Sequence, residues 1–302
     1  MKQAIIKQQT VQQETRKKRL ETMDIVALVL MTLITLSILI PFYNSIVISF
    51  STISAYLRNP FAFWPSEGTL ENYSIVLKNG IIFTSYKNTI LITVVGTVLS
   101  MSVSVAAAFV FSRKSFPGKR LFFLMMLFTM FFSGGTIPTY LVIKRLGLID
   151  HRSVIILMCG ISTFNIIVMK NGFEQVPDAL EEAARIDGAN DLQIFFQVLL
   201  PLQTAQIATF TLFTAVAYWN EWFWSMLALN SSSKMTLMSY LRAIVMEASG
   251  VMEDTAADVE VNSFTMGIKM ATVVLTMLPI MCVYPFLQKY FAKGILVGAV
   301  KM

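Results

Sequence analysis

Few side chains in this sequence have the type and spacing needed for catalysis or for specific binding, and most of them lie in one acidic segment. Residues 174–191 hold six carboxylates in a chain otherwise poor in charge: Glu174, Asp178, Glu181, Glu182, Asp187 and Asp191. Such carboxylates suit recognition of a partner's arginine, because one guanidinium can donate two hydrogen bonds to one carboxylate. His151 is the one histidine, and no nucleophile or metal-ligand set accompanies it in the sequence. The pattern predicts a protein-binding segment, with no catalytic residue and no metal site.

The same segment carries the start and stop signals of a short helix. Pro177 has the fixed backbone angle that suits a first helical turn. Gly188 can adopt the left-handed conformation that ends a helix. Asn190 lies three residues before Gln193, which is the spacing of a capping box at the start of a second helix. We therefore expect a rigid helix between Pro177 and Gly188, and a second one directly after it.

The rest of the chain has the composition of a membrane protein. Of its 302 residues, 55% are hydrophobic and only 14% are charged, against about 25% charged in soluble proteins. This composition excludes a soluble globular fold, a disordered chain and a disulfide scaffold. A helix needs about 20 apolar residues to cross the hydrocarbon core of a bilayer. The charge-free stretches predict an all-α fold with six transmembrane helices at about 25–48, 88–112, 121–143, 153–170, 202–227 and 270–288.

Lysine and arginine set the expected orientation. If the N-terminal tail 1–23 is cytoplasmic, the inner segments hold 15 of the 24 Lys and Arg residues, and this excess marks the cytoplasmic side. Both termini are then inside, within a single transmembrane domain over 24–302. The acidic loop 174–201 is also inside, and 49–87 and 231–268 are long outer loops. The same excess explains the net charge of +6 without a nucleic-acid partner.

The acidic segment resembles a known signature. Glu182-Ala183-Ala184, Gly188, Val198 and Leu200-Pro201 are spaced as in the EAA loop of permease subunits of binding-protein-dependent ABC importers, where Ile is usual in place of Val198. Four other stretches resemble the maltose-type second permease of the carbohydrate branch: Thr69-Leu70-Glu71-Asn72-Tyr73, Trp219-Asn220-Glu221, Tyr290-Phe291-Ala292-Lys293-Gly294 and Gly298-Ala299-Val300-Lys301. Nearly the whole chain after about residue 20 is covered. Within the branch, the chain most resembles permeases for complex oligosaccharides, of the lipoprotein and pectin-oligosaccharide type.

This resemblance implies the type I importer permease fold and a helix that couples the permease to a separate ATPase. The residues implied in coupling are Glu182, Ala183, Ala184, Arg185, Asp187, Gly188 and Pro201. The implied partners are a sister permease in a heterodimer, two ATPase subunits or a homodimeric ATPase, an external solute-binding protein, and the lipid of the bacterial cell membrane. In maltose-type relatives the loop corresponding to 231–268 reaches into the binding protein, and part of 245–260 is expected to do so here.

The sequence also bears on where ATP binds. It contains no Gly-x4-Gly-Lys-Ser/Thr loop to hold phosphates. We therefore expect a non-catalytic subunit with no cofactor of its own, and ATP and Mg²⁺ bound by the partner ATPase.

Polar and helix-breaking residues inside the apolar stretches are candidates for the transport path. A break in a spanning helix is tolerated where it lines a cavity or is buried in protein, and an intramembrane carboxylate is a functional candidate. Each candidate also has a structural interpretation: a simple kink, an interfacial tyrosine, a helix-to-helix hydrogen bond, or an aromatic belt around the one acid. The candidates are Gly134, Gly135, Pro138, Tyr140, Asn165, Asn220 and Glu221.

The sequence leaves three alternative functions open. The first is an importer permease of the same architecture for a non-sugar solute. The second is an ion-coupled secondary transporter, for which internal repeats and several intramembrane ionisable residues are typical. The third is a membrane anchor or sensor, which has no need of a helix shaped for an ATPase.

Overall fold

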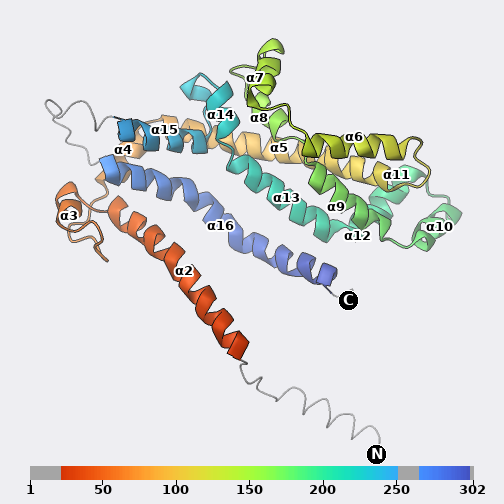
Figure 1. Ribbon diagram of the computed structural model, residues 1–302, viewed down its shortest axis with the longest axis horizontal. Helices are drawn as coiled ribbons and strands as arrows, with labels where there is room; N and C mark the ends of the chain where they lie inside the picture. Colours follow the sequence, from red (N-terminus) through yellow and green to blue (C-terminus); the bar gives the residue numbers. More distant parts are fainter. Residues whose placement is uncertain (1–21, 251–264, 300–302) are drawn as a thin grey trace, which may run out of the picture.

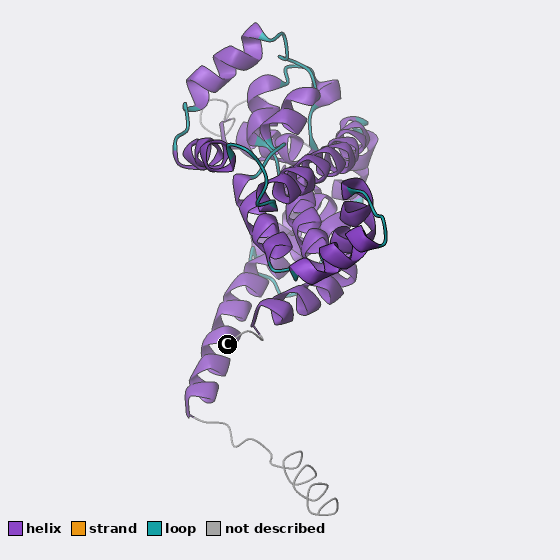
Figure 2. Cartoon of the chain, turned by 90° about the vertical axis from the view of Figure 1, so that its right-hand side faces the viewer, coloured by secondary structure: helices purple, strands orange, loops and turns teal. Residues whose placement is uncertain are grey.

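The computed structural model describes residues 22–250 and 265–299, and its regular structure is helical, with one isolated antiparallel bridge between Ser51 and Gly68 (Figure 2). The α-helices are α2 (Thr22–Ser49), α3 (Ile53–Arg58), α4 (Glu71–Lys78), α5 (Ile81–Ser112), α6 (Lys119–Phe131), α7 (Thr136–Arg145), α8 (Ser153–Met158), α9 (Thr163–Glu174), α10 (Asp178–Ile186), α11 (Asp191–Gln193), α12 (Leu200–Leu202), α13 (Thr204–Trp219), α14 (Phe223–Ala228), α15 (Leu237–Gly250) and α16 (Thr265–Ala299). A π-helical stretch, η1 (Ile194–Leu199), joins α11 to α12, and a 3-10 turn, η2 (Ser232–Lys234), precedes α15. The tail 1–21 and most of the expected binding-protein segment 245–260 lie outside the described residues.

The long helix α5 is the centre of the molecule. It packs against α13 and α9, while α2 packs against α16 (Figure 1). A core cluster that includes Met101, Ile166 and Phe173 joins α5 to α9 and to the segment after α10. In α2 the buried side chains are those of the last three residues, 47–49; residues 42–46 are half-buried, and 22–41 are exposed. An all-helical chain whose helices are apolar on their outer surfaces has the composition expected of a bundle embedded in lipid.

The six expected spans fall into two groups in the structure. The expected spans 25–48, 88–112 and 270–288 fall inside α2, α5 and α16, but the other three stretches are each divided into shorter helices. In the described ranges, three helices are long and apolar enough to cross a membrane, and two bent pairs meet the same criterion only when each pair is joined. The bends are 113° between α6 and α7 and 79° before α13. The count of six is therefore not reached by this criterion.

Local residues explain two of these interruptions. α6 ends at Phe131, and Gly135, directly before α7, has φ of +86°, a non-helical conformation that glycine adopts readily. At Gly160, between α8 and α9, a Cβ would lie 2.9 Å from the carbonyl oxygen of Ile156, so a larger residue would need the chain to move. Charge-free length alone could not reveal these breaks, because glycine is compatible with both a continuous and an interrupted apolar stretch.

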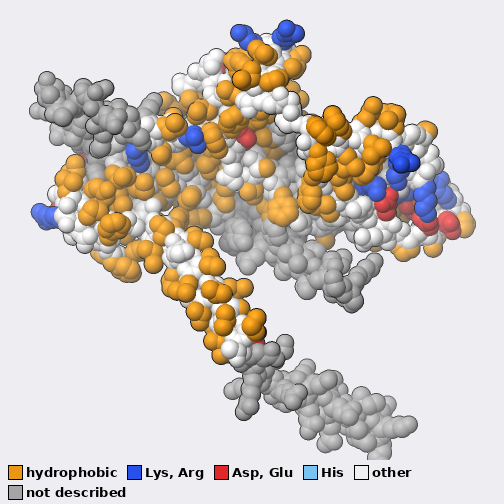
Figure 3. All heavy atoms as spheres, in the orientation of Figure 1, with side chains coloured by type: hydrophobic (Ala, Val, Ile, Leu, Met, Phe, Trp, Pro, Cys, Tyr) orange, Lys and Arg blue, Asp and Glu red, His pale blue; other side chains and the backbone are white. Residues whose placement is uncertain are grey.

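Polar contacts bind the segment before α15 to the start of α5. The Asn88 amide donates to the carbonyl oxygens of Ser233 and Met235, each at 3.0 Å, and Thr89 Oγ1 accepts from the Leu237 backbone N–H at 2.8 Å. The coupling-loop candidate α10 lies beyond the other end of α5 (Figure 1). The two ends of α5 thus carry two different polar regions, and acidic and basic side chains gather around the α10 end (Figure 3).

Candidate functional site

The acidic loop folds into the helix that its sequence predicts. α10 runs from Asp178 to Ile186, so Pro177 directly precedes the helix instead of occupying its first turn. Asp178 and Glu181 lie in the first turn and Arg185 in the last, where their charges complement the helix dipole. The helix is therefore favoured by its own sequence as well as by packing.

A Schellman motif closes the C-terminal end of α10. Gly188 has φ of +83°. Its N–H donates to the Arg185 carbonyl at 3.0 Å, and the Ala189 N–H donates to the Ala184 carbonyl at 2.9 Å, which is the bond pair of this motif. A side chain at position 188 would meet no atom within 4 Å, so the glycine is required by backbone conformation and not by space.

The expected capping box follows at once. The Gln193 backbone N–H donates to Asn190 Oδ1 at 2.9 Å, and the Asn190 backbone N–H donates to Gln193 Oε1 at 2.8 Å. Between the two helices only residues 187–190 lack regular structure. The loop is therefore a stiff two-helix element, which can transmit a displacement that a flexible loop would absorb.

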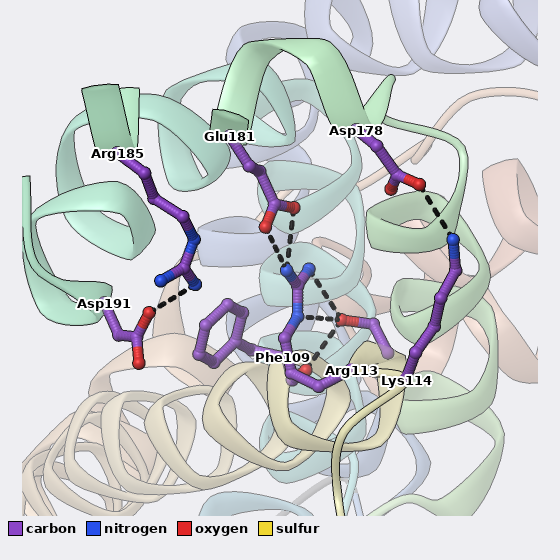
Figure 4. A network of polar contacts seen from close by, with 8 residues as sticks. Phe109, Arg113, Lys114, Asp178, Glu181, Arg185 and Asp191 are labelled. Carbon is purple, nitrogen blue, oxygen red and sulfur yellow. Dashed lines mark hydrogen bonds and ion pairs between the residues drawn. The ribbon is translucent and has the colours of Figure 1, made fainter. Parts of the chain in front are cut away.

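An arginine from another part of the chain anchors this element (Figure 4). Arg113, just after α5, places Nη1 2.5 and 2.7 Å from the two carboxylate oxygens of Glu181. Its guanidinium lies 4.6 Å from the centre of the Phe109 ring and donates from Nε and Nη2 to Ser112 Oγ. The two ion-paired side chains are 25% and 15% exposed, so this contact is partly shielded from water and salt.

Four further ion pairs hold the same region together. Lys114 Nζ lies 2.8 Å from Asp178 Oδ2 in an exposed pair, and this hydrogen bond and charge lower the pKa of Asp178 below its ordinary value. Arg185 binds Asp191 at 2.6 Å, across the turn between α10 and α11. Glu174 accepts from both Lys119 and Lys170.

The charge state of Glu174 follows from that environment. Burial raises the pKa of its carboxyl group, and hydrogen bonds from Lys170 and Lys119 outweigh that effect, so the pKa is lowered overall. Glu174 thus joins α9 to the start of α6 as a charged group.

These pairings revise the expectation that the whole acidic segment is available to a partner. Four of its carboxylates are bound by cations of this chain. Glu182 and Asp187 are exposed and form no ion pair within the described part of the chain. The cations Arg113, Lys114 and Lys119 were not among the sequence candidates. The sequence feature that could have indicated them is the basic loop 113–120, which is expected on the same side of the membrane as the acidic loop.

α10 turns one face to its own chain and the other to the outside. Ala184 packs against the core cluster of α5 and α9. Ala179, Glu182, Ala183 and Ile186 are exposed at the spacing of one helical face, and Ile186 is 86% exposed. Pro201, in the short helix α12, is also exposed. The outward face combines small and apolar side chains with a single carboxylate.

The pathway candidates do not form one site. Gly134, Gly135 and Pro138 lie exposed at the 113° break between α6 and α7, and Tyr140 follows on α7. Asn165, buried on α9, donates to Thr214 Oγ1 of α13 at 3.3 Å, which is the geometry of a bond between neighbouring helices.

Asn220 and Glu221 lie at the break between α13 and α14. Asn220 is exposed. Glu221 Oε1 accepts from the Trp224 backbone N–H at 2.7 Å, so this carboxylate caps the start of α14. This bond gives Glu221 a local structural role beside the two interpretations expected for it, which are cavity lining or gate stabilisation, and an interface anchor.

Comparisons with known proteins show which family and which relatives this chain is similar to. Residues 80–297 match the family described as the inner membrane component of binding-protein-dependent transport systems. The chain is 41% identical over 289 residues to the polygalacturonan/rhamnogalacturonan transport system permease YtcP of Bacillus subtilis, covering 94% of this chain and 99% of that protein. It is 40% identical over 265 residues to the protein LplC of the same organism, covering 87% and 89%.

A solved structure shares the fold over nearly the whole chain. It belongs to a bacterial ABC transporter involved in the import of the acidic polysaccharide alginate, with a TM-score of 0.79, 35% identity, and coverage of 92% of this chain and 98% of that chain. These comparisons confirm the resemblance found from the EAA-type residues and the all-helical permease fold. The chain is a membrane-embedded transport component, and it belongs to the family of inner membrane components of binding-protein-dependent transport systems.

Proposed function

We propose that this chain is one of two permease subunits of an ATP-driven importer, and that α10 docks on a separate ATPase that binds ATP and Mg²⁺. The observation that carries the proposal is the stiff, anchored α10 with its exposed face. An ATPase that moves this helix would also move the end of α5, because Arg113 and Glu181 join the two. The proposed coupling residues are Glu182, Ala183, Ala184, Arg185, Asp187, Gly188 and Pro201.

Those residues divide into two roles by their surroundings. Glu182 and Ala183 lie on the exposed face and would contact the ATPase directly. Ala184, Arg185 and Gly188 contact or shape this chain itself, so they would hold the helix in place. A small apolar face with one carboxylate suits a shallow apolar groove that contains an arginine or lysine.

The cargo we propose is an oligosaccharide that contains acidic sugars, delivered by an external solute-binding protein. Support comes from the names of two relatives over 30% identical, one for polygalacturonan and rhamnogalacturonan and one for alginate. A more distant structural neighbour was solved with a periplasmic protein bound to alginate pentasaccharide. The orientation that fits this proposal has α10 in the cytoplasm and α15 on the outer side.

Affinity purification in mild detergent tests the docking assignment. From wild type we expect an ATPase and a sister permease, identified by mass spectrometry. Ala183→Trp enlarges the exposed face of α10 without a contact inside this chain, so it should lose the ATPase and keep the sister permease. Ser232→Trp, at an exposed position near the other end of α5, is the matched control and should keep both. Retention of the ATPase by Ala183→Trp at the wild-type level would contradict docking at this face.

A further inference from the structure

The two ends of α5 differ in how their cations are used. At the α10 end, all but Arg120 of the six cations of loop 113–120, α9 and α10 form ion pairs in the described ranges: Arg113, Lys114, Lys119, Lys170 and Arg185. Near the α15 end and on α7, several cations form no ion pair with any carboxylate in residues 22–250 and 265–299: Lys78, Lys87, Lys144, Arg145, Arg152, Arg242 and Lys269. A cation without a carboxylate partner in the described ranges is available to bind an anion.

One of these cations is held in a defined geometry. The guanidinium carbon of Arg242, on α15, lies 3.7 Å from the centre of the Trp222 ring. The Nε of Arg242 is buried and has no hydrogen-bond partner among the described residues. A guanidinium stacked on an aromatic face is fixed in orientation while its N–H groups stay free to donate within their plane. The side chain is therefore arranged for an acceptor that the described chain does not supply.

Glu221, the acid next to Trp222 in the sequence, is not that acceptor. Glu221 directs one carboxylate oxygen to the Trp224 backbone N–H, and its other oxygen lies 3.7 Å from Cys159 Sγ. It forms no ion pair with Arg242. Trp222 and Arg242 thus form a pair of an aromatic ring and a free guanidinium, at the break between α13 and α14.

We propose that Arg242, held on the Trp222 ring, binds the carboxylate of a uronic acid unit as the oligosaccharide enters the permease. This assignment rests on the proposed function. A guanidinium can donate two hydrogen bonds to a carboxylate, whereas a neutral sugar offers no such acceptor. α15, which carries Arg242, lies at the end of α5 opposite α10 (Figure 1), which is the outer end in the proposed orientation. It therefore selects for acidic cargo at the point where the binding protein releases it.

The test uses the whole importer, trapped with vanadate together with its loaded binding protein. We would measure the dissociation constant of radiolabelled trigalacturonate and of its methyl ester, which has the same length without the charge. The variants are Arg242→Gln and Arg242→Lys, with Arg145→Gln as a control because Arg145 is an exposed, unpaired cation on α7. Retained binding protein shows that each complex has formed.

We expect Arg242→Gln to weaken trigalacturonate binding by about tenfold or more, since a hydrogen-bonded charge is lost, and to leave the ester unaffected. Arg242→Lys should recover part of the affinity, and Arg145→Gln should match wild type. An unchanged trigalacturonate affinity in Arg242→Gln, or equal losses for acid and ester, would overturn the site. If Arg242→Gln forms no trapped complex, the measurement is made on Arg242→Lys. An equal loss of affinity for trigalacturonate and for its methyl ester in that variant would overturn the site. A wild type that retains no uronide would instead reject the acidic cargo of the proposed function.

Discussion

Removing the Arg113 side chain should uncouple ATP hydrolysis from transport without detaching the ATPase. In Arg113→Gln the Glu181 carboxylate, 15% exposed, loses its guanidinium partner. Hydrogen bonds to charged groups contribute about 1.5–3 kcal/mol, and partial exposure reduces this to about 1–2 kcal/mol. Since about 1.4 kcal/mol is a factor of ten, the population in which α10 follows α5 should fall by roughly tenfold.

The assay is the number of sugar molecules transported per ATP hydrolysed in proteoliposomes. We expect a several-fold lower ratio for Arg113→Gln, with the ATPase still copurifying because the outward face of α10 is intact. Lys114→Gln is the matched control on the same loop: its ion pair is 87% and 70% exposed, so its loss should have little effect. The charge-swapped pair Arg113→Glu with Glu181→Arg should recover part of the ratio. Equal effects of Arg113→Gln and Lys114→Gln, or no recovery in the swapped pair, would refute the reasoning.

Three other predictions follow from single positions. Gly188→Val should reduce coupling, because its φ of +83° costs a non-glycine residue about 1–2 kcal/mol, whereas Gly188→Asn should be tolerated; the same transport-to-hydrolysis ratio checks both. Gly96→Ala should lower the melting temperature in detergent, because its Cβ would lie 2.6 Å from the Tyr218 ring, while Gly80→Ala, with no atom within 4 Å, should not. The pKa of Asp150 is lowered by hydrogen bonds from Lys234 and Ser231, so its stabilisation is full above its ordinary pKa and is lost as the pH falls through the lowered value. The melting temperature of Asp150→Asn should therefore lack that acid-side decline, and a parallel decline in both proteins would contradict it.

Local signals in the sequence were sufficient for the coupling loop. Helix α10, the left-handed Gly188 and the Asn190–Gln193 capping box depend on residues within a few positions of one another, and the structure contains all three. Backbone conformation is fixed there by short-range effects such as glycine's freedom and side-chain caps. The pattern of EAA-type residues was also specific enough to identify the family.

Contacts between distant segments could not be obtained in the same way. Arg113 and Glu181 are 68 positions apart, and no local sequence pattern near either residue indicates that the two form an ion pair. Gly134, Gly135 and Pro138 indicated the break between α6 and α7, but nothing indicated the break at Gly160, because a count of apolar length does not register a single glycine. Glu221 is a candidate because it is the one acid in an expected span. Its bond to the Trp224 backbone N–H could not be predicted, because it depends on a helix start that hydropathy does not reveal.

The unequal lengths of two neighbouring helices have a consequence for the surrounding lipid. α5 has 32 residues and α13 has 16, and they pack side by side. At 1.5 Å per residue they are about 48 and 24 Å long. A hydrocarbon core of about 30 Å is shorter than α5, whose polar start lies outside the expected span, and longer than α13. The membrane must therefore thin beside α13, at a modest energy for each ångström of mismatch, unless the bent segment before α13 completes the span. Transport should therefore vary with the acyl-chain length of the lipids, and should be fastest where short chains meet α13 without deformation.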